Sequence, residues 1–146
     1  MELTEGSSFV ELCTFSNNAR SDHGGAIVVA QPADLTLWYA GLYNNTAPLG
    51  GAVWLDGTST MIVTDLSYNE ADAGGAIYVS TNGQLVSDDG IQTGNIAEEG
   101  GANYVAGNAE LYNQYSWFNT ATYGGTHYVT GTMTSSEADD VIVPVT

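Results

Sequence analysis

The chain has 146 residues and carries 17 acidic residues against one Arg and no Lys, so its formal net charge at pH 7 is −16. Such a charge repels phosphate backbones and anionic headgroups, which argues against nucleic acid or a bare membrane surface as a partner. An apolar content of 43%, with no apolar run long enough to cross a bilayer, is typical of one folded domain over residues 1–146 without membrane insertion.

Cys13 is the single cysteine, which excludes an internal disulfide, and its place in the strand-like segment 9–15 predicts a buried thiol. Residues 1–8 have neither the basic nor the apolar part of a secretory signal peptide, which fits an intracellular chain or a mature or excised segment. Asn44-Asn45-Thr46 has the N-glycosylation pattern, so Asn44 is a potential acceptor if the source is eukaryotic and secretory.

Short segments rich in β-branched and aromatic residues follow one another along the chain, and none has the long periodicity of a helix. In chain order they are residues 26–30, 35–40, 52–56, 60–68, 76–80, 110–118 and 126–131. The sequence therefore predicts an all-β fold.

A turn-prone phrase, Asn-x-Ala followed by a Gly pair, recurs between these strands. The Gly pairs begin at positions 24, 50, 74, 100 and 124, so the intervals are 26, 24, 26 and 24 residues. A period of 20 to 50 residues indicates a solenoid, a propeller or an array, and about 25 residues are too few for a four-stranded propeller blade. We predict a single-stranded parallel β-helix of about five to six coils of 24–26 residues, with residues 1–16 and 132–146 as terminal coils or edges.

Equivalent positions of such a helix stack about 4.8 Å apart, because neighbouring coils pair like neighbouring strands. Stacked Asn side chains can then pass hydrogen bonds between coils, and paired glycines permit positive φ and close backbone approach. Between Asn17 and Gly24 the first repeat has two more residues than the other repeats, which we interpret as a loop insertion. The predicted turn ladder comprises Asn17, Asn45, Asn69, Asn95 and Asn119 with Gly24, Gly25, Gly50, Gly51, Gly74, Gly75, Gly100, Gly101, Gly124 and Gly125.

Two columns follow the Gly pairs. The wholly aliphatic one, which we expect to face the core, is Val29, Leu55, Val79, Val105 and Val129. The alternate column, which then faces outward, is Val28, Trp54, Tyr78, Tyr104 and Tyr128. If the alternation is the other way round, the aromatic side chains would instead stack in the core. Outward, the four aromatics could form a flat stripe about 15 Å long for a sugar or a protein partner, or merely stabilise the sheet.

The tetrapeptides Gly24–Ile27, Gly50–Val53 and Gly74–Ile77 each follow an Asn-containing turn, and Phe15–Asn18 has the pattern FxxN. These motifs resemble the repeats of the polymorphic outer-membrane-protein family, which pair GGA plus Ile, Leu or Val with FxxN. Later turns lack the Phe, and the last two glycine tetrapeptides read GGAN and GGTH. The resemblance implies a right-handed β-helix that is extracellular or at the cell surface and is associated with adhesion.

Acidic residues are the main candidates for catalysis. A glycoside hydrolase needs two carboxylates about 5 to 9.5 Å apart, and the nearest candidates are Asp88-Asp89, Asp139-Asp140 and the cross-coil pair Asp65 and Asp89. Acids are common on the turns of a soluble solenoid, so we expect no catalytic site. A lyase generally needs a cationic base and substrate clamps, for which only Arg20 is available.

His23 and His127 should lie about four coils, roughly 19 Å, apart, so they cannot share a metal ion. The sequence has no Cys/His cluster with metal-ligand spacing and no phosphate-binding Gly loop. We therefore expect no cofactor and no metal, with diffuse Ca²⁺ binding by the acidic loops 87–90 and 137–140 as the alternative. His127 beside Asn103 marks the less apolar end of the predicted core.

A β-helix exposes unpaired strand edges at its ends, and neither end of this sequence has an amphipathic helix to cover them. The tail 141–146 has the pattern of an edge strand, with Pro144 blocking further pairing. We predict an extracellular, non-enzymatic structural or adhesive module that assembles end to end into a homo-oligomer or filament, or forms part of a larger surface protein. A polysaccharide-active hydrolase or lyase and a carbohydrate-binding module are the alternatives, with glycans or cell-surface proteins as partners.

Overall fold

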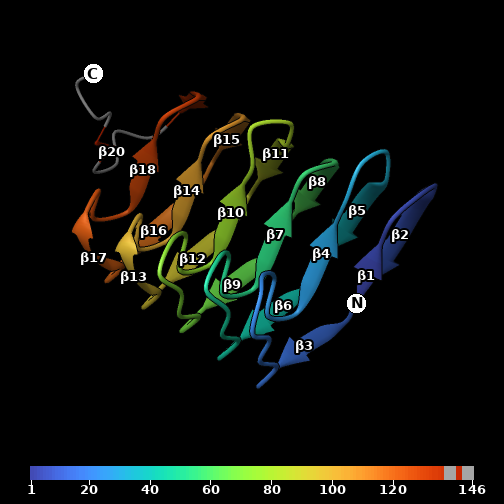
Figure 1. Cartoon of the computed structure of the whole chain (residues 1–146), viewed down its shortest axis with the longest axis horizontal. Coiled ribbons are helices and arrows are strands. Elements are labelled where there is room, and N and C mark those ends of the chain that lie inside the picture. Colours follow the sequence, from blue (N-terminus) through green and yellow to red (C-terminus); the bar gives the residue numbers. More distant parts are fainter. Residues whose placement is uncertain (137–140, 143–146) are drawn as a thin grey trace.

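Parallel strands stacked in successive coils form the chain (Figure 1). The computed structural model describes residues 1–136 and 141–142, and these contain strands and turns but no helix. Among the residues described, none therefore belongs to a helix with the length and apolar character needed to cross a bilayer. The predicted all-β parallel β-helix over most of the chain is confirmed.

Three sheets run along the axis, each with one strand per coil. Sheet A has seven strands, in the spatial order β1 (Glu2–Leu3), β4 (Ile27–Val29), β7 (Val53–Leu55), β10 (Ile77–Val79), β14 (Asn103–Val105), β18 (His127–Val129) and β20 (Val141–Ile142). Sheet B has six: β2 (Ser7–Glu11), β5 (Asp34–Trp38), β8 (Thr58–Ile62), β11 (Gln84–Asp88), β15 (Asn108–Tyr112) and β19 (Thr132–Ser135). Sheet C has five: β3 (Thr14–Ser16), β6 (Gly41–Tyr43), β9 (Asp65–Ser67), β12 (Ile91–Thr93) and β16 (Tyr115–Trp117). Strands β13 (Ile96–Glu99) and β17 (Thr120–Tyr123) pair with each other.

The register of sheet A shows that one repeat is one coil. Ile27 lies opposite Val53, Val53 opposite Ile77, Ile77 opposite Asn103, and Asn103 opposite His127. These partners are 26, 24, 26 and 24 residues apart, the same intervals as the Gly pairs. We number the coils one to six from their sheet A strands, β1 to β18. Strand β20 pairs with β18 with Val141 opposite His127, so this last return, 141 − 127 = 14 residues, is shorter than a coil.

The paired glycines form one corner of each coil, and the two members of a pair have different roles. Gly50 has φ +64°, a conformation in which a residue with a Cβ is strained by about 1–2 kcal/mol. Gly51 leaves no room for a side chain, because an added Cβ would lie 2.2 Å from the carbonyl oxygen of Gly75 in the next coil. Positive φ and close backbone approach, both expected of the pair, are confirmed.

Coils one to five each have two further left-handed corners, which are mostly made by residues other than glycine. The corner between sheets B and C is occupied by Leu12, Tyr39, Val63, Asp89 and Asn113, and the corner after sheet C by Asn17, Asn44, Tyr68, Gly94 and Phe118. Asn and Asp tolerate positive φ, whereas β-branched Val63, with φ 51°, is an outlier that its stacked neighbours must hold in place.

A ladder of asparagines follows the second of these corners. The Asn69 Oδ1 accepts hydrogen bonds from the backbone N–H and the Nδ2 of Asn45, at 3.0 and 3.1 Å. Asn95 accepts the same two bonds from Asn69, and Asn119 accepts them from Asn95. The predicted ladder from Asn45 to Asn119 is therefore confirmed.

The prediction that Asn17 begins the ladder is wrong. The first rung is Asn18, whose Nδ2 donates to Asn45 Oδ1 at 2.9 Å, while Asn17 is the exposed corner residue with φ 57°. β-Bridges pair Ala19 with Thr46 and His23 with Leu49. The interval from Ala19 to His23 is therefore one residue longer than the interval from Thr46 to Leu49 that it faces. The first loop thus holds one extra residue, not two, and aligning the Asn-x-Ala pattern shifts the rung by one position.

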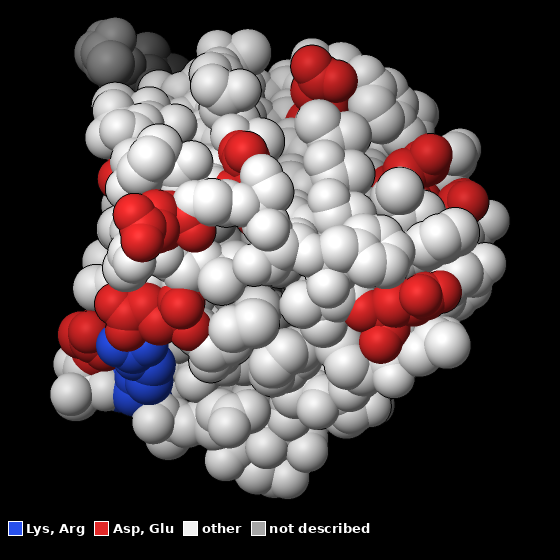
Figure 2. Space-filling view, turned by 90° about the vertical axis from the view of Figure 1, so that its right-hand side faces the viewer, with Lys and Arg blue, Asp and Glu red and all other residues white. Residues whose placement is uncertain are grey.

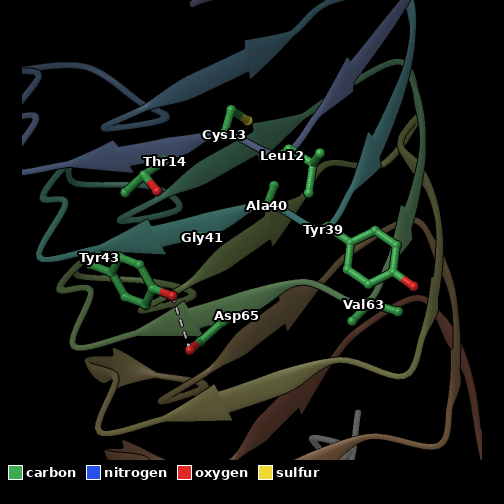
Figure 3. A pocket seen from close by; sticks show the side chains of 9 residues that line it. All are labelled: Leu12, Cys13, Thr14, Tyr39, Ala40, Gly41, Tyr43, Val63 and Asp65. Carbon is green, nitrogen blue, oxygen red and sulfur yellow. Dashed lines mark hydrogen bonds between the residues drawn. The ribbon is translucent and has the colours of Figure 1, made fainter.

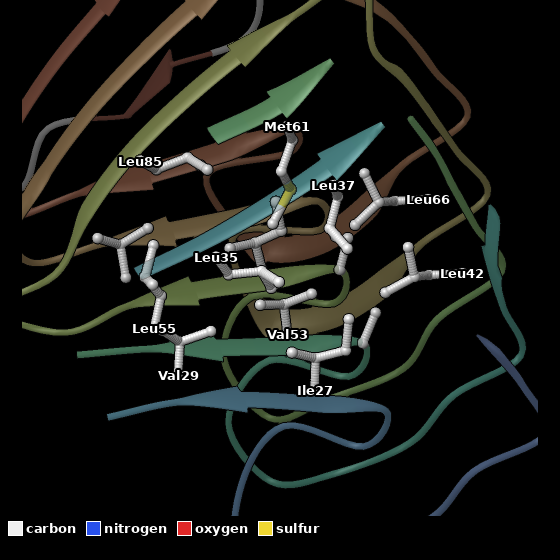
Figure 4. Packing of buried hydrophobic residues seen from close by; sticks show 14 of the residues in the cluster. Ile27, Val29, Leu35, Leu37, Leu42, Val53, Leu55, Met61, Leu66 and Leu85 are labelled. Atoms are coloured by element: carbon white, nitrogen blue, oxygen red, sulfur yellow. The ribbon is translucent and has the colours of Figure 1, made fainter. Parts of the chain in front are cut away.

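The core is filled by inward-facing side chains from all three sheets (Figure 4). In coils two and three it is aliphatic apart from Ser59, with Ile27, Leu42 and Leu66 fully buried. In coils four to six polar side chains enter the same columns, the fully buried Gln92, Asn103 and His127. The expectation that Asn103 and His127 mark a less apolar end of the core is confirmed.

Candidate functional site

The aromatic column of sheet A faces outward, as predicted. Trp54, Tyr78, Tyr104 and Tyr128 are all half-buried, while the alternate column from Val29 to Val129 is buried. Val28 is the exception, because it belongs to the outward column yet is only 1% exposed. It lies against the Gly24 corner, where an added Cβ would be 2.7 Å from Val28 Cγ2.

Three tyrosines of this column stack on one another. The ring centroids of Tyr78 and Tyr104 lie 4.7 Å apart with an angle of 11° between the planes, and those of Tyr104 and Tyr128 lie 5.2 Å apart at 30°. Rings stacked in this way use their faces on each other and present mainly edges to solvent. A sugar platform needs exposed faces, so the flat stripe expected from the sequence does not form here, and the geometry favours stabilisation of the sheet.

The remaining member of the column, Trp54, has a different partner. The ring of His23 lies 4.3 Å from it, centroid to centroid, at an angle of 43°. His23 comes from the longer first loop, which places it over the sheet, and this contact has no signal in the repeat pattern. His23 and His127 are thus in separate environments, one on the surface and one in the core, as their spacing predicts.

Glu99, the last residue of strand β13, lies near the tyrosine stack. Burial raises the pKa of the Tyr78 hydroxyl above its ordinary value, and the neighbouring Tyr104 and Glu99 raise it further. The Tyr78 hydroxyl therefore remains a neutral donor at physiological pH. A negatively charged ligand would be repelled from this face.

Three of the acidic residues considered for catalysis, Asp65, Asp88 and Asp89, lie in the described part of the chain, and each has different surroundings. Asp88 ends strand β11 and accepts a hydrogen bond from Asn113 Nδ2 at 2.8 Å, while Asp89 is an exposed corner residue. Asp65 lies opposite Ile91, two positions beyond Asp89, so Asp65 and Asp89 do not share a register position. Asp139 and Asp140 lie outside the described residues. Among the residues described, no three His, Cys, Asp or Glu side chains gather as metal ligands would.

Asn44 and Cys13 also have defined places. Asn44 is exposed at the corner after sheet C, with φ 52°, so its side chain is accessible. Cys13 faces the core from the first coil but is only partly buried, in contrast to the buried thiol that the sequence predicts. Burial still raises its pKa, a change that its backbone hydrogen bond partly offsets.

The N-terminal end of the solenoid is a feature that the repeat pattern does not reveal in detail. Here the inward-facing side chains of the first coil are only partly covered, whereas the same columns one coil later are 0% exposed. The two sets are Leu3, Val10 and Phe15, and then Val29, Leu37 and Leu42. Figure 2 looks at this end and shows an uncharged centre with acidic side chains around its margin and Arg20 at one side. We call this surface the N-terminal end face.

The open edges of β1, β2 and β3 surround this face. The Gly6 carbonyl accepts from Asp34 N–H at 2.9 Å, and Leu12 N–H donates to the Trp38 carbonyl at 3.0 Å, so even-numbered residues of β2 bond to β5. Successive residues of a strand alternate in this respect. The N–H and C=O groups of Ser7, Phe9 and Glu11 therefore point out of the N-terminal end face.

No family model matches the chain. A protein of Dictyostelium discoideum, metabotropic glutamate receptor-like protein R, is 30% identical over 127 residues, which is 86% of this chain and 6% of that protein. The chain therefore spans only a small part of the length of this relative. No solved structure matches. The solenoid that the GGA tetrapeptides imply is present, and the repeat family that they suggest remains a resemblance.

Proposed function

We propose that the chain is a structural β-solenoid module of an extracellular or cell-surface assembly, and that it pairs end to end through its N-terminal end face. The observation that supports this most strongly is the half-covered core of the first coil. Burying Leu3, Val10 and Phe15 beneath another coil would add apolar contacts of the kind that hold coils two and three together. Full burial of such a side chain is worth about 1.5–3 kcal/mol relative to full exposure, so completing a partial burial yields a fraction of this for each.

The exposed backbone of β2 supports the same proposal. Unpaired N–H and C=O groups in a row are a template for another strand, and the side chains beside them do not block it with Lys or Pro. The acids stand at the margin of the N-terminal end face, and its centre is uncharged (Figure 2). Charge therefore opposes sideways association more than contact along the axis.

The alignment with the receptor-like protein fits a modular role. A segment similar to this one occupies 6% of a much longer chain, where it must adjoin other segments. The side chains also favour a structural role over an enzymatic one, because Asp65 and Asp88 accept hydrogen bonds from neighbouring side chains and Asp89 is an exposed corner residue. An extracellular setting follows from the resemblance to surface-protein repeats and is part of the proposal.

Sedimentation velocity over a wide range of protein concentration tests end-to-end pairing. Phe9→Pro removes one N–H from the open edge of β2, and Phe9→Ala is the matched control that keeps the N–H while removing the same exposed ring. We expect the wild type and Phe9→Ala to associate as concentration rises and Phe9→Pro to remain monomeric, with circular dichroism unchanged in all three. A wild type that stays monomeric throughout would refute the proposal, as would Phe9→Pro that associates like Phe9→Ala.

A further inference from the structure

An open hollow of about 380 Å³ lies at the corner between sheets B and C in the first three coils (Figure 3). Its floor consists of small residues and its walls of two tyrosines, with apolar side chains at the rim and a single charged group. These residues are Ala40, Gly41, Tyr39, Tyr43, Val63 and Asp65. The size is in the range of small ligand pockets, and the hollow is separate from the tyrosine stack of sheet A.

The hollow exists because of one glycine. In the outward column that begins sheet C, coils one to five carry Thr14, Gly41, Asp65, Ile91 and Tyr115. Large side chains fill this position in coils four and five, whereas Gly41 has no side chain and leaves room for the ring of a neighbouring residue. The ring of Tyr43 lies over the gap, since a Cβ on Gly41 would be 2.5 Å from Tyr43 Cε2.

The carboxylate of Asp65 is held in a fixed orientation beside this ring. Its Oδ2 accepts a hydrogen bond from the Tyr43 hydroxyl at 3.1 Å, and its Oδ1 accepts one from the Ser67 hydroxyl. Each carboxylate oxygen can accept a further bond. The pKa of Tyr43 is raised by burial and by the charge of Asp65, so its hydroxyl stays a donor.

No cation of the chain neutralises this carboxylate. Within the described residues, all ion pairs involve Arg20 or His23, which pair with Glu2 and Asp22. The hollow thus combines the negative charge of Asp65, two tyrosine rings and an apolar rim. The rim is formed by Leu12 and Val63, which are 77% and 36% exposed. This is the chemistry that holds an alkyl chain ending in a cation, through an ion pair and cation–π contacts.

We propose that this hollow binds a Lys or Arg side chain of a basic protein partner. The aliphatic stem would lie against Leu12 and Val63, and the charged group would lie beside the Tyr43 ring and the Asp65 carboxylate. Charge complementarity selects this occupant over others, because a net charge of −16 attracts a basic surface and repels an acidic one, and leaves a neutral sugar unaffected. The proposal is tested separately from end-to-end pairing, since Asp65 lies in the third coil and Phe9 does not line the hollow.

The test uses the tripeptide acetyl-Ala-Lys-Ala-amide and the same peptide with its lysine acetylated, which removes the charge. Binding is followed by backbone amide chemical shifts in the full chain. Asp65→Asn removes the charge in the hollow, and Asp56→Asn is the matched control. Asp56 is also half-buried and accepts side-chain hydrogen bonds from Ser80 and Asn82, but it lies outside the hollow, so the net charge changes equally in both variants.

We expect the charged peptide to shift amides around Gly41 and Asp65 and the acetylated peptide to bind much more weakly. Asp65→Asn should weaken binding about tenfold, the effect of a charge-assisted hydrogen bond, and Asp56→Asn less than about twofold. Equal weakening by both variants would mean that only the overall charge attracts the peptide, and the proposal would fail. It would also fail if the acetylated peptide, or a neutral methyl glycoside, shifted the same amides while the charged peptide did not. Phe9→Pro should leave the peptide affinity unchanged, so the outcome is separable from that of the assembly experiment.

Discussion

Asn69 is the rung of the asparagine ladder whose hydrogen bonds are most completely buried, and Asn69→Ala tests what the ladder contributes. The side chain is 1% exposed and takes part in four hydrogen bonds. Its Oδ1 accepts from the N–H and Nδ2 of Asn45, and its Nδ2 donates to the Leu42 carbonyl and to Asn95 Oδ1, all between 3.0 and 3.1 Å. Truncation removes these bonds at once.

The magnitude follows from which groups are left without a partner. Loss of a neutral hydrogen bond costs about 1 kcal/mol net, and a buried group left unpaired about 1–3 kcal/mol. Asn69→Ala leaves the buried Asn45 N–H in this state and removes three further bonds, so we expect a loss of roughly 3–5 kcal/mol in the free energy of unfolding. Asn18→Ala is the matched control at the open end of the ladder. It removes the exposed rung, whose Oδ1 accepts no bond from another rung, and should cost about 0.5–1.5 kcal/mol.

Urea unfolding followed by far-ultraviolet circular dichroism gives both values, with unchanged slopes as the check that only stability has changed. A third variant, Asn69→Asp, keeps the acceptors but places a carboxylate in the core, where burial raises its pKa above the unfolded value. Its stability should therefore be greater at pH 4 than at pH 7, relative to the wild type. Equal losses in Asn69→Ala and Asn18→Ala would refute the ladder as a source of stability.

Two further predictions concern the Gly corner and the tyrosine stack. Gly75→Ala should lower the free energy of unfolding by about 3 kcal/mol or more, because its Cβ would lie 2.1 Å from the Gly101 carbonyl oxygen. Gly6→Ala, which has open space and φ +74°, should cost only the backbone strain of about 1–2 kcal/mol. Urea unfolding of both variants compares these losses, and equal losses would contradict the close-approach argument. The pKa of Tyr78 is raised in the folded chain, so the unfolded state ionises first, and the stability should fall as pH rises above the ordinary value of 10.0. Thermal unfolding against pH checks this, and a fall of the same steepness in Tyr78→Phe would exclude Tyr78 as its source.

The repeat pattern predicts the coil length and the glycine corners because both depend on residue type alone. Positive φ at Gly50 and the crowded backbone at Gly51 both require glycine, so the corner can be recognised from the sequence. The ladder is visible for a related reason, since only a short amide can donate and accept between coils. The error at Asn17 arises where two asparagines adjoin, because the one-residue bulge that selects Asn18 is a property of the pairing between coils.

The other left-handed corners have no such signal. Tyr39, Val63 and Phe118 adopt positive φ although their side chains do not favour it, because the register of the stacked coils leaves no other path. A sequence cannot show this, since the reason lies in neighbouring coils. Gly41 is different: an isolated Gly within a strand pattern indicates close approach of another group, and that group is the ring of Tyr43. The positions of the Tyr43 ring and the Asp65 carboxylate depend on side-chain rotamers and on the register between coils, neither of which follows from residue type.

The two ends of the solenoid differ, and this bears on the form of the assembly. At the N-terminal end all three sheets have open edges and the core columns end in apolar side chains. At the other end the edge strands among the residues described are β20 of sheet A, β19 of sheet B, β16 of sheet C and β17, which pairs with β13. A head-to-tail contact would place Phe15 over the column that ends in Ser116.

Contact between two N-terminal end faces would instead bring Leu3, Val10 and Phe15 of both copies together, and it uses the open edges of all three sheets. Such a contact is isologous and stops at a dimer, whereas the head-to-tail contact is heterologous and continues into a filament. The match between apolar side chains favours the isologous dimer, whereas the parallel register of the coils favours the head-to-tail filament. The sedimentation experiment separates them, because a dimer gives a boundary that stops changing with concentration, while a filament gives one that continues to grow.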